Sequence, residues 1–255
     1  MDPASLAGMG LSLVAIFVSM IMEGGNPASI LLPAPIILVI FGTLGTAMAG
    51  GMLKDSLGLI NLIKKAVLSK KVDGTEIIDV VVKLADRARR EGLLALEDEA
   101  KKVDDPFLRK GLELAIDGTD SEEVREILEA EIDTKRKADK AGAKIFNDMG
   151  GFAPTIGIIG TVLGLVHVLE NLSDPSTLGE LIAGAFVATL FGVMTANVIW
   201  LPMANRLKRI SELECEQMQL ALEGVLAIQA GSNPRLVARK LRSLVPASAE
   251  QDKAA

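Results

Sequence analysis

Four apolar stretches constrain this chain more than any other feature of its 255 residues. They cover residues 6–22, 30–49, 152–169 and 182–203, and a helix needs about 20 apolar residues to cross a bilayer. Residues 1–5 contain no Lys or Arg, so the first stretch predicts a retained membrane helix and not a signal peptide. Because the charged segments show no alternation typical of strands, the sequence predicts an all-α integral membrane protein with four transmembrane helices.

Charge divides the chain into consecutive parts, in which apolar pairs of helices alternate with charged segments. We expect transmembrane helices 1 and 2 in residues 1–50, a cytoplasmic helical domain in 51–147, transmembrane helices 3 and 4 in 148–203, and a cytoplasmic C-terminal helix and tail in 204–255.

The distribution of Lys and Arg orients these helices. Every Lys and Arg lies between Lys54 and Lys144 or from Arg206 onward, whereas the short connections at 23–29 and 170–180 carry only acidic charges. Cytoplasmic segments of membrane proteins carry the excess of basic residues. Both short connections are therefore expected outside the membrane, with the N- and C-termini in the cytoplasm.

Composition and motifs argue against several classes of function. A net charge of −6 disfavours nucleic-acid binding. A single cysteine and a single histidine cannot form a disulfide framework or a multi-ligand zinc site within one chain. No Walker-type glycine loop, GxSxG elbow or HExxH motif occurs in the sequence. We expect that the protein is not an enzyme and that it has no catalytic residues, no metal site and no cofactor.

Small residues recur at helical spacing on one face of the third and fourth apolar stretches, which lets membrane helices approach closely. The pattern is consistent with a packing seam between helices. It is also consistent with a face that lines a pathway or slides against another helix, with two hydroxyl groups as its only side-chain polarity. The residues concerned are Pro154, Gly157, Thr161 and Gly164 in the third stretch, and Ala185, Ala188, Thr189, Gly192 and Ala196 in the fourth.

The apolar stretches lack Asp, Glu, Lys and Arg at mid-helix depth. Pumps and proton relays normally place an ionisable group there. If ions cross the membrane at this protein, a partner must supply the carboxylate.

The charged segment between the membrane pairs has the pattern of a compact helical domain. Residues 75–91 carry an apolar stripe at helical spacing, a second short helix follows Gly92, and a third begins near Pro106. Thr119 and Glu122 have the spacing of a capping box, which predicts the start of a long helix.

Two long helices, 119–146 and 204–230, are expected to continue the third and fourth membrane helices into the cytoplasm. The charge cluster RARREGLLALEDE, residues 87–99, has two interpretations. It is either a solvated face with ion pairs along the helix or an electrostatic docking surface for a partner.

Five segments together resemble the MotA/PomA family of flagellar motor stator subunits, and the resemblance covers nearly the whole chain. The segments are ARREGLLALE (88–97), FAPTIGIIGTVLGLVHVL (152–169), AFVATLFG (185–192), LPMANRLKR (201–209) and EGVLAIQAGSNPRLV (223–237).

The resemblance implies a ring, with five copies in the family's architecture, around a pair of single-span, peptidoglycan-binding MotB-type subunits in the bacterial cytoplasmic (inner) membrane. Each MotB-type helix supplies an ion-binding aspartate, and proton or sodium flow turns the ring so that its cytoplasmic loops exert torque on the rotor protein FliG. The resulting motility serves chemotaxis.

Family motifs also imply roles for particular residues. Arg89 and Glu97 match the rotor-binding charges, and Pro154 and Pro202 match two prolines of gating or conformational function.

The expected ion pathway contains Thr161 and Thr189, and the seam facing the partner helix contains Gly157, Gly164, Ala185 and Gly192.

One position departs from the family pattern. Many relatives carry an acid three residues before the first proline, where this chain has Gly151, with Asp148 one turn earlier. We transfer no role to either residue. The identity of the ion also stays open: sodium-type members tend to have a threonine at the position of Thr161, where proton-type members tend to have alanine.

The alternative function is that of an ExbB/TolQ-type energiser of outer-membrane processes, a distant relative of the same kind. Such proteins have three membrane helices and an external N-terminus, whereas this sequence predicts four helices and an internal N-terminus.

Overall fold

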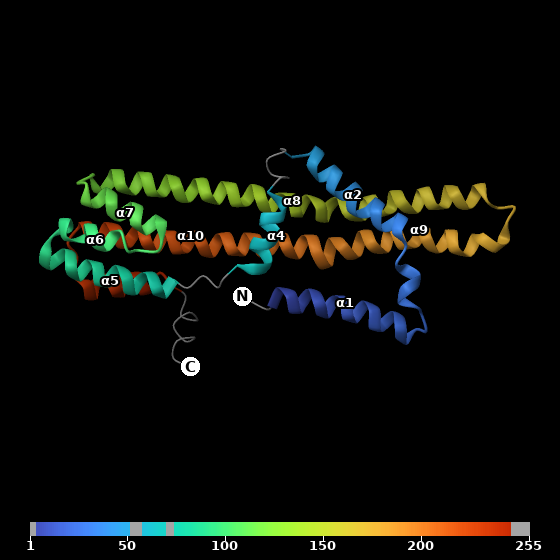
Figure 1. Cartoon of the computed structure of the whole chain (residues 1–255), viewed down its shortest axis with the longest axis horizontal. Coiled ribbons are helices and arrows are strands. Elements are labelled where there is room, and N and C mark those ends of the chain that lie inside the picture. The colour runs from blue at the N-terminus through green and yellow to red at the C-terminus, as the bar shows by residue number, and fades with distance from the viewer. Residues whose placement is uncertain (1–3, 52–57, 70–73, 246–255) are drawn as a thin grey trace. The chain divides into compact units, whose positions relative to one another are not determined.

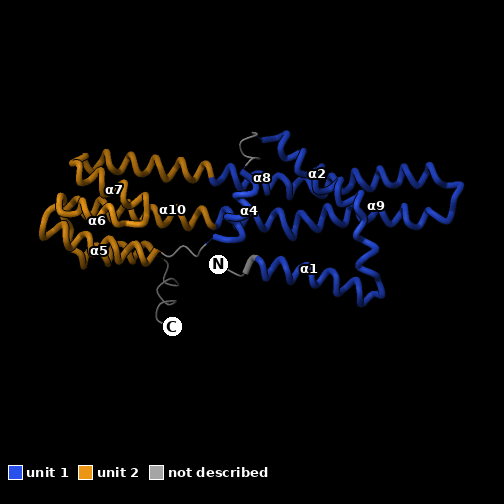
Figure 2. The backbone as a smooth tube through the Cα atoms, viewed as in Figure 1, with its two compact units in different colours: residues 1–70, 139–209 blue, residues 71–138, 210–255 orange. Residues whose placement is uncertain are grey.

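The computed structural model describes residues 4–51, 58–69 and 74–245 (Figure 1), and every regular element within these ranges is a helix. The all-α prediction is confirmed for this part of the chain. Two compact units are formed from interleaved segments (Figure 2): unit 1 comprises residues 1–70 and 139–209, and unit 2 comprises residues 71–138 and 210–255. Two long helices, α8 and α10, contribute residues to both units.

Unit 1 contains the apolar helices. Their bounds are α1 (Ala4–Met22), a 3₁₀ turn η1 (Pro27–Ile30), α2 (Pro33–Ala49), the short α4 (Leu59–Leu68), the C-terminal part of α8 (Ser121–Glu170), α9 (Pro175–Thr195), a π-helical turn η3 (Ala196–Trp200) and the start of α10 (Leu201–Gln229).

By length and composition, two helical stretches can cross a membrane, Ser121–Glu170 and Pro175–Gln229, while Leu6–Met22 and Pro33–Ala49 are shorter apolar helices. The second apolar stretch, predicted from residue 30, begins as an α-helix only at Pro33. Proline is favoured in the first turn of a helix, where its missing N–H removes no hydrogen bond.

Pro202 explains the irregular turn that precedes it. A proline cannot donate to the carbonyl four residues earlier, and its ring collides with that carbonyl in a regular α-helix. The chain widens here into the π-helical turn η3, in which the Leu201 N–H donates to the Ala196 carbonyl. The helix continues past the proline without a break.

Unit 2 is a helical domain with a conventional apolar core. It contains α5 (Gly74–Glu91), a 3₁₀ turn η2 (Leu93–Leu96), α6 (Glu97–Ala100), α7 (Pro106–Ile116), the N-terminal part of α8, the C-terminal part of α10, and α11 (Pro234–Arg242). Large side chains fill the core, among them Leu96, Leu108, Leu112, Leu128, Leu222, Ile228 and Leu241. The helices predicted at 75–91, after Gly92 and near Pro106 are confirmed.

The predicted cap of α8 is wrong by one residue. The Asp120 carboxylate accepts a hydrogen bond from the Glu122 N–H at 2.9 Å, and its carbonyl accepts one from Val124. Thr119 lies one residue earlier, where its carbonyl accepts a hydrogen bond from Gln229 Nε2 at 2.6 Å. The helix therefore starts at Ser121, behind an aspartate cap.

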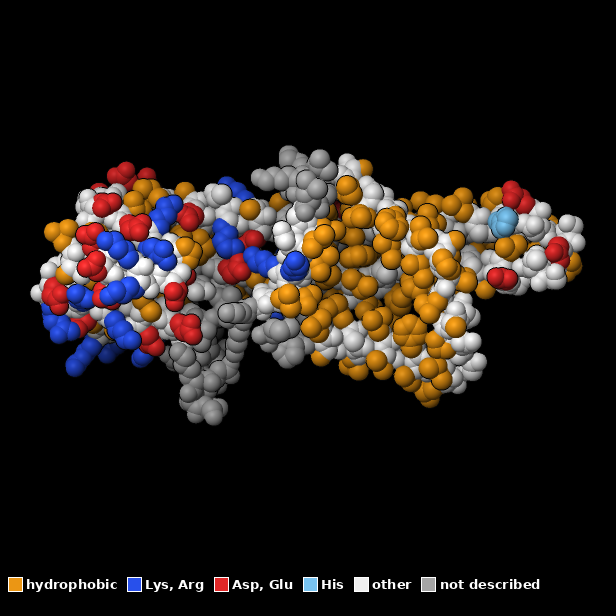
Figure 3. Space-filling view, viewed as in Figure 1, with side chains coloured by type: hydrophobic (Ala, Val, Ile, Leu, Met, Phe, Trp, Pro, Cys, Tyr) orange, Lys and Arg blue, Asp and Glu red, His pale blue; other side chains and the backbone are white. Residues whose placement is uncertain are grey.

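The surfaces of the two units differ in polarity (Figure 3). Charged side chains of both signs cover α5, α6 and α7, whereas hydrophobic side chains cover the surface around α2 and α9. In unit 1, large apolar side chains on α1, α2, α8 and α9 are exposed, including Leu11, Phe41, Val162, Leu163 and Phe186. A surface of this kind is expected where lipid or another membrane helix replaces water.

Candidate functional site

The small-residue faces predicted on the third and fourth apolar stretches meet each other within one chain. A Cβ added at Gly157 would lie 2.8 Å from the Ala188 carbonyl oxygen, and one added at Gly192 would lie 2.6 Å from the Ala153 carbonyl oxygen. At Gly164, the added atom would lie 2.7 Å from the Ala185 Cβ. These separations are too short for real Cβ contacts, so α8 and α9 pack with their backbones nearly touching.

We call this contact the small-residue seam, and its members are Gly157, Gly160, Gly164, Ala185, Ala188 and Gly192. These residues pack α8 against α9, as the packing interpretation of the small-residue pattern predicted. Ala185, Gly157 and Gly192 are buried between α8 and α9, so the seam joins two helices of the same chain. The partner-facing role expected for Gly157, Gly164, Ala185 and Gly192 stays a prediction.

The two hydroxyl groups predicted to line the ion pathway lie together across the seam. Thr161 Oγ1 and Thr189 Oγ1 are hydrogen-bonded to each other. Thr161 Oγ1 also contacts the Ala185 carbonyl oxygen at 3.0 Å and the Gly157 carbonyl oxygen at 3.2 Å, and Thr189 Oγ1 lies 3.4 Å from the latter. Two hydroxyl and two carbonyl oxygens are thus clustered inside an apolar helix pair, and both side chains are partly buried.

Both prolines lie inside helices of unit 1. Pro154 lies inside α8, where it cannot donate to the Gly150 carbonyl. An added Cβ at Gly150 would lie 2.5 Å from the Leu201 side chain, so Leu201, the residue before Pro202, packs into the space left by this glycine.

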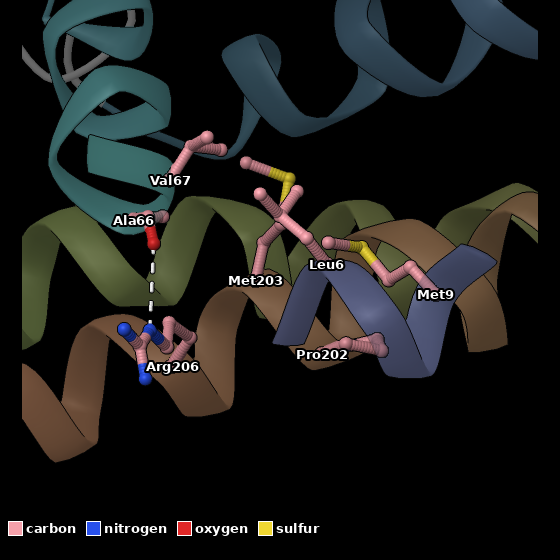
Figure 4. A pocket seen from close by; sticks show the side chains of 7 residues that line it. All are labelled: Leu6, Met9, Ala66, Val67, Pro202, Met203 and Arg206. Carbon is pink, nitrogen blue, oxygen red and sulfur yellow. Dashed lines mark hydrogen bonds between the residues drawn. The ribbon is translucent and has the colours of Figure 1, made fainter. Parts of the chain in front are cut away.

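Pro202 lines a small cavity of about 10 Å³ with residues of α1, α4 and α10 (Figure 4). Arg206 closes one side of it, because its Nε donates to the Ala66 carbonyl at 3.4 Å. The other lining residues are Leu6, Met9, Val67 and Met203. The proline on α10 therefore lines the same cavity as residues of α1 and of the short amphipathic α4.

Gly151 stands where many members of the family carry an acidic residue, and there is free space around it. A Cβ added at Gly151 would meet no atom within 4 Å, and the residue is exposed. Asp148, one turn earlier, is ion-paired with Lys144 at 2.6 Å. A β-carbon at position 151 would therefore meet no steric obstacle among the residues that the structure describes.

The rotor-binding charges predicted from the family lie on a bend between α5 and α6 in unit 2. We call residues 86–102 the charged bend. Gly92 makes the turn with φ of 86°, a backbone conformation that glycine adopts without strain. Arg87 spans the bend, because its Nη1 lies 2.8 Å from Glu99 Oε1 and its Nε lies 3.1 Å from Glu91 Oε2.

Electrostatic shifts in the charged bend follow from these pairs. The hydrogen bond to Glu91, with a further contribution from Glu99, raises the pKa of Arg87 above its ordinary value. The hydrogen bond from Lys102, helped by Arg87, lowers the pKa of Glu99. Glu97 raises the pKa of Lys101, whose Nζ lies 2.9 Å from Glu97 Oε1.

Arg89 and Glu97 differ in their intrachain partners. Arg90 pairs with Asp86 and Glu97 pairs with Lys101, but the Arg89 side chain forms no ion pair or hydrogen bond with any residue that the structure describes. Both Arg89 and Glu97 are exposed. The bend therefore presents one cation without a carboxylate partner and one carboxylate that a neighbouring lysine already neutralises.

Sequence reasoning missed two features of these sites. Gly160 belongs to the seam, where an added Cβ would lie 2.7 Å from the Ala188 Cβ and 2.9 Å from Leu38 Cδ2. Its spacing from Gly157 and Gly164 was the available signal. Leu94 is 76% exposed on the charged bend, and the surrounding apolar run LLAL gave no sign that one of its leucines is exposed.

Known proteins resemble this chain in both sequence and structure. A model of the MotA/TolQ/ExbB proton channel family matches residues 99–220. Motility protein A of Bacillus subtilis (strain 168) is 38% identical over 97% of this chain and 92% of its own length.

Two solved structures extend the similarity to the fold. A chain from the flagellar MotAB stator complex of Bacillus subtilis has a TM-score of 0.90 at 36% identity, covering 99% of this chain and 100% of that chain. A chain from the C. jejuni MotAB structure has a TM-score of 0.92 at 29% identity and covers 97% of each chain.

Proposed function

Because this chain belongs to the MotA/TolQ/ExbB proton channel family, we propose that it is the A-type subunit of a flagellar stator, which converts ion flow into torque on the rotor. One observation carries this proposal: the similarity to motility proteins and MotAB stator structures extends over nearly the whole chain and includes both units. The same observation favours a motility protein over an ExbB/TolQ-type energiser.

We propose four membrane-spanning helices in the bacterial inner membrane, with both termini in the cytoplasm. The exposed apolar surface of unit 1 supports the location, and the restriction of Lys and Arg to residues 54–144 and to positions from 206 onward supports the orientation. Under this proposal the charged helices of unit 2 lie in the cytoplasm.

The ion pathway requires a second kind of subunit. The apolar stretches carry no ionisable group at mid-helix depth, and two solved structures that resemble this chain are of MotAB complexes. We propose that a MotB-type single-span subunit supplies the carboxylate beside Thr161 and Thr189, and that this chain forms a ring of five copies around a pair of such partners. One charge crossing 100 mV releases about 2.3 kcal/mol, enough to bias a conformational step.

The conducted ion is proposed to be a proton or a sodium ion, and Thr161 is the residue that separates the two. Sodium must exchange its hydration water for oxygen ligands, which the hydroxyl pair and the Gly157 and Ala185 carbonyls offer. One observation argues against sodium: the Thr161 hydroxyl is already hydrogen-bonded to the Ala185 carbonyl, a contact that joins α8 to α9. The ion is identified by measuring swimming speed over a range of external sodium concentrations at constant proton-motive force. A speed that does not change with sodium, together with a Thr161→Ala variant that swims almost as wild type, means protons. A speed that rises with sodium concentration means sodium.

On the cytoplasmic side, we propose that the charged bend contacts the rotor protein FliG. The exposed Arg89 cation, which has no partner among the described residues, supports this assignment, since a carboxylate of the rotor can bind it without displacing a pair seen there. Pro154 and Pro202 are proposed as the positions where α8 and α10 adjust during ion passage.

Complementation tests the proposed function. The chain and its MotB-type partner are expressed in a strain lacking its own stator, and both swimming and co-purification of the two proteins are measured. Restored swimming together with a stable complex is the expected result. A stable complex that leaves the cells non-motile, in a strain whose own stator genes restore motility, contradicts the proposal.

A further inference from the structure

One leucine on the charged bend is exposed although its neighbours enter the core. Leu94 is 76% exposed, more than any other large apolar side chain in the described part of unit 2. Leu96, two residues later, is completely buried, and Leu93 packs against the core. Single exposed leucines are common on protein surfaces, and this one is distinguished by the backbone of the bend on which it lies.

The backbone of the bend holds Leu94 away from the core. Gly92 has φ of 86°, and a Cβ added to it would meet no atom within 4 Å. Glycine is thus required here by the backbone conformation and not by lack of space. The Ala95 N–H donates to the Gly92 carbonyl at 3.3 Å, and the Arg87–Glu99 ion pair at 2.8 Å closes the loop at its base. Leu94 lies near the middle of this closed loop.

Charges of opposite sign flank the exposed leucine along the chain. Arg89 and Arg90 precede it, and Glu97 and Asp98 follow it; all four are exposed. An apolar centre with a charged rim is the usual anatomy of a protein–protein contact. A preformed loop also loses little conformational entropy when it binds.

We propose that Leu94 is an apolar anchor in the contact with the rotor, inserted between the charges that flank it. The matching surface on the rotor has an apolar hollow, a carboxylate on the Arg89 side and a basic group on the Glu97 side. The inference rests on the proposed function, because it takes the charged bend as the rotor-facing surface.

Salt dependence separates the anchor from the charges. Burial of a leucine is not screened by salt, whereas the attraction between exposed charges is. The stator complex of this chain with its MotB-type partner is immobilised in nanodiscs, and the dissociation constant for purified FliG is measured at low and at high salt. Leu94→Ala is expected to weaken binding roughly tenfold at both salt concentrations. Arg89→Ala is expected to weaken binding at low salt and to reduce the dependence on salt.

Two further variants complete the test. Leu236 on α11 is also an exposed leucine of unit 2, 61% exposed, so Leu236→Ala is the matched control and is expected to bind as wild type. Leu94→Met, which keeps an apolar side chain of similar size, is expected to restore most of the affinity. Wild-type affinity of Leu94→Ala at both salt concentrations overturns the anchor alone. Failure of the wild-type complex to bind FliG overturns the assignment of the bend to the rotor, and the anchor with it.

Discussion

The contact between α8 and α9 in unit 1 and the core of unit 2 are packed in different ways. In unit 1, α8 and α9 meet through glycine and alanine, and large apolar side chains such as Leu163 and Phe186 are exposed. In unit 2, large side chains such as Leu112 and Leu128 are completely buried, and ion pairs cover the surface. The difference follows from the solvent that each unit is proposed to face. Burial of apolar area drives association in water, whereas in lipid close packing has to do so.

The largest effect is expected from truncation in the core of unit 2. Leu128→Ala removes a side chain with 0% exposure and should lower the local free energy of unfolding by about 2–5 kcal/mol. Hydrogen exchange of the α7 and α10 backbone amides in the intact complex measures the loss.

The matched truncation in unit 1 is Leu163→Ala, at a residue with 57% exposure. Its effect on exchange of the α8 amides should stay within about 0.5 kcal/mol. A loss in unit 1 as large as that in unit 2 would mean that the exposed face of α8 is a tightly packed interface, and the contrast between the units would fail.

The reverse substitution, from small to large, is expected to damage unit 1. Gly157→Ala pushes a methyl group toward the Ala188 carbonyl, at 2.8 Å, and overpacking of this kind costs about 1–3 kcal/mol. Gly151→Ala on the same helix meets open space and should be neutral or slightly stabilising, since alanine favours helix. The measurement is the thermal stability of the two purified variants. Equal stability would show that α8 and α9 are not closely packed at Gly157.

An ion-paired cluster in unit 2 should make that unit sensitive to acid. Burial raises the pKa of Glu223, but the Lys240 ammonium at 2.6 Å, together with Arg125, outweighs it, so the pKa lies below its ordinary value of 4.5. A carboxylate with a lowered pKa stabilises the fold above that ordinary value, and the contribution is lost as the pH falls through the lowered pKa.

Lys240→Gln should therefore lower the protection of α11 amides by about 1 kcal/mol at neutral pH and leave it unchanged at strongly acidic pH. Lys137, an exposed lysine of unit 2, provides the control Lys137→Gln, for which no loss is expected. A loss in Lys240→Gln that is independent of pH would point to packing instead of charge.

The smallest effect is expected on the charged bend. Lys101 competes with any external cation for Glu97, with which it pairs at 2.9 Å across one helical turn. Pairs of this kind contribute about 0.2–0.5 kcal/mol, so Lys101→Gln should tighten FliG binding by roughly twofold at low salt. Weaker binding in this variant would show that Lys101 itself contacts the rotor.

Local signals in the sequence were sufficient for much of the fold. Pro106 and Gly92 predicted the ends of helices, because each acts through its own backbone, and the spacing of Gly157, Thr161 and Gly164 predicted a shared helix face. The cap of α8 was predicted one residue too early, at Thr119, because the neighbouring Asp120 is an equally suitable capping residue.

The candidate sites were less accessible to sequence reasoning. Periodicity defines which residues share a face, but it does not say whether that face meets the same chain or another; the seam meets α9 of the same chain. Pairing among dense charges also depends on side-chain positions, so the difference between Arg89 and Glu97 was not predictable. The exposure of Leu94 depends on the conformation of Gly92, which no hydrophobic pattern encodes.

The central claim is that unit 1 carries ions and unit 2 transmits force to the rotor. Parallel measurement of ion uptake and motor torque in the Arg89→Glu, Glu97→Lys double variant tests it most directly, because both changes lie on the exposed surface of the charged bend. We predict a large loss of torque, partly restored by opposite charge reversals on FliG, with ion uptake and the amount of membrane-inserted complex unchanged. Unaltered torque, or a loss of ion uptake in proportion to torque, would contradict this division of function between the two units.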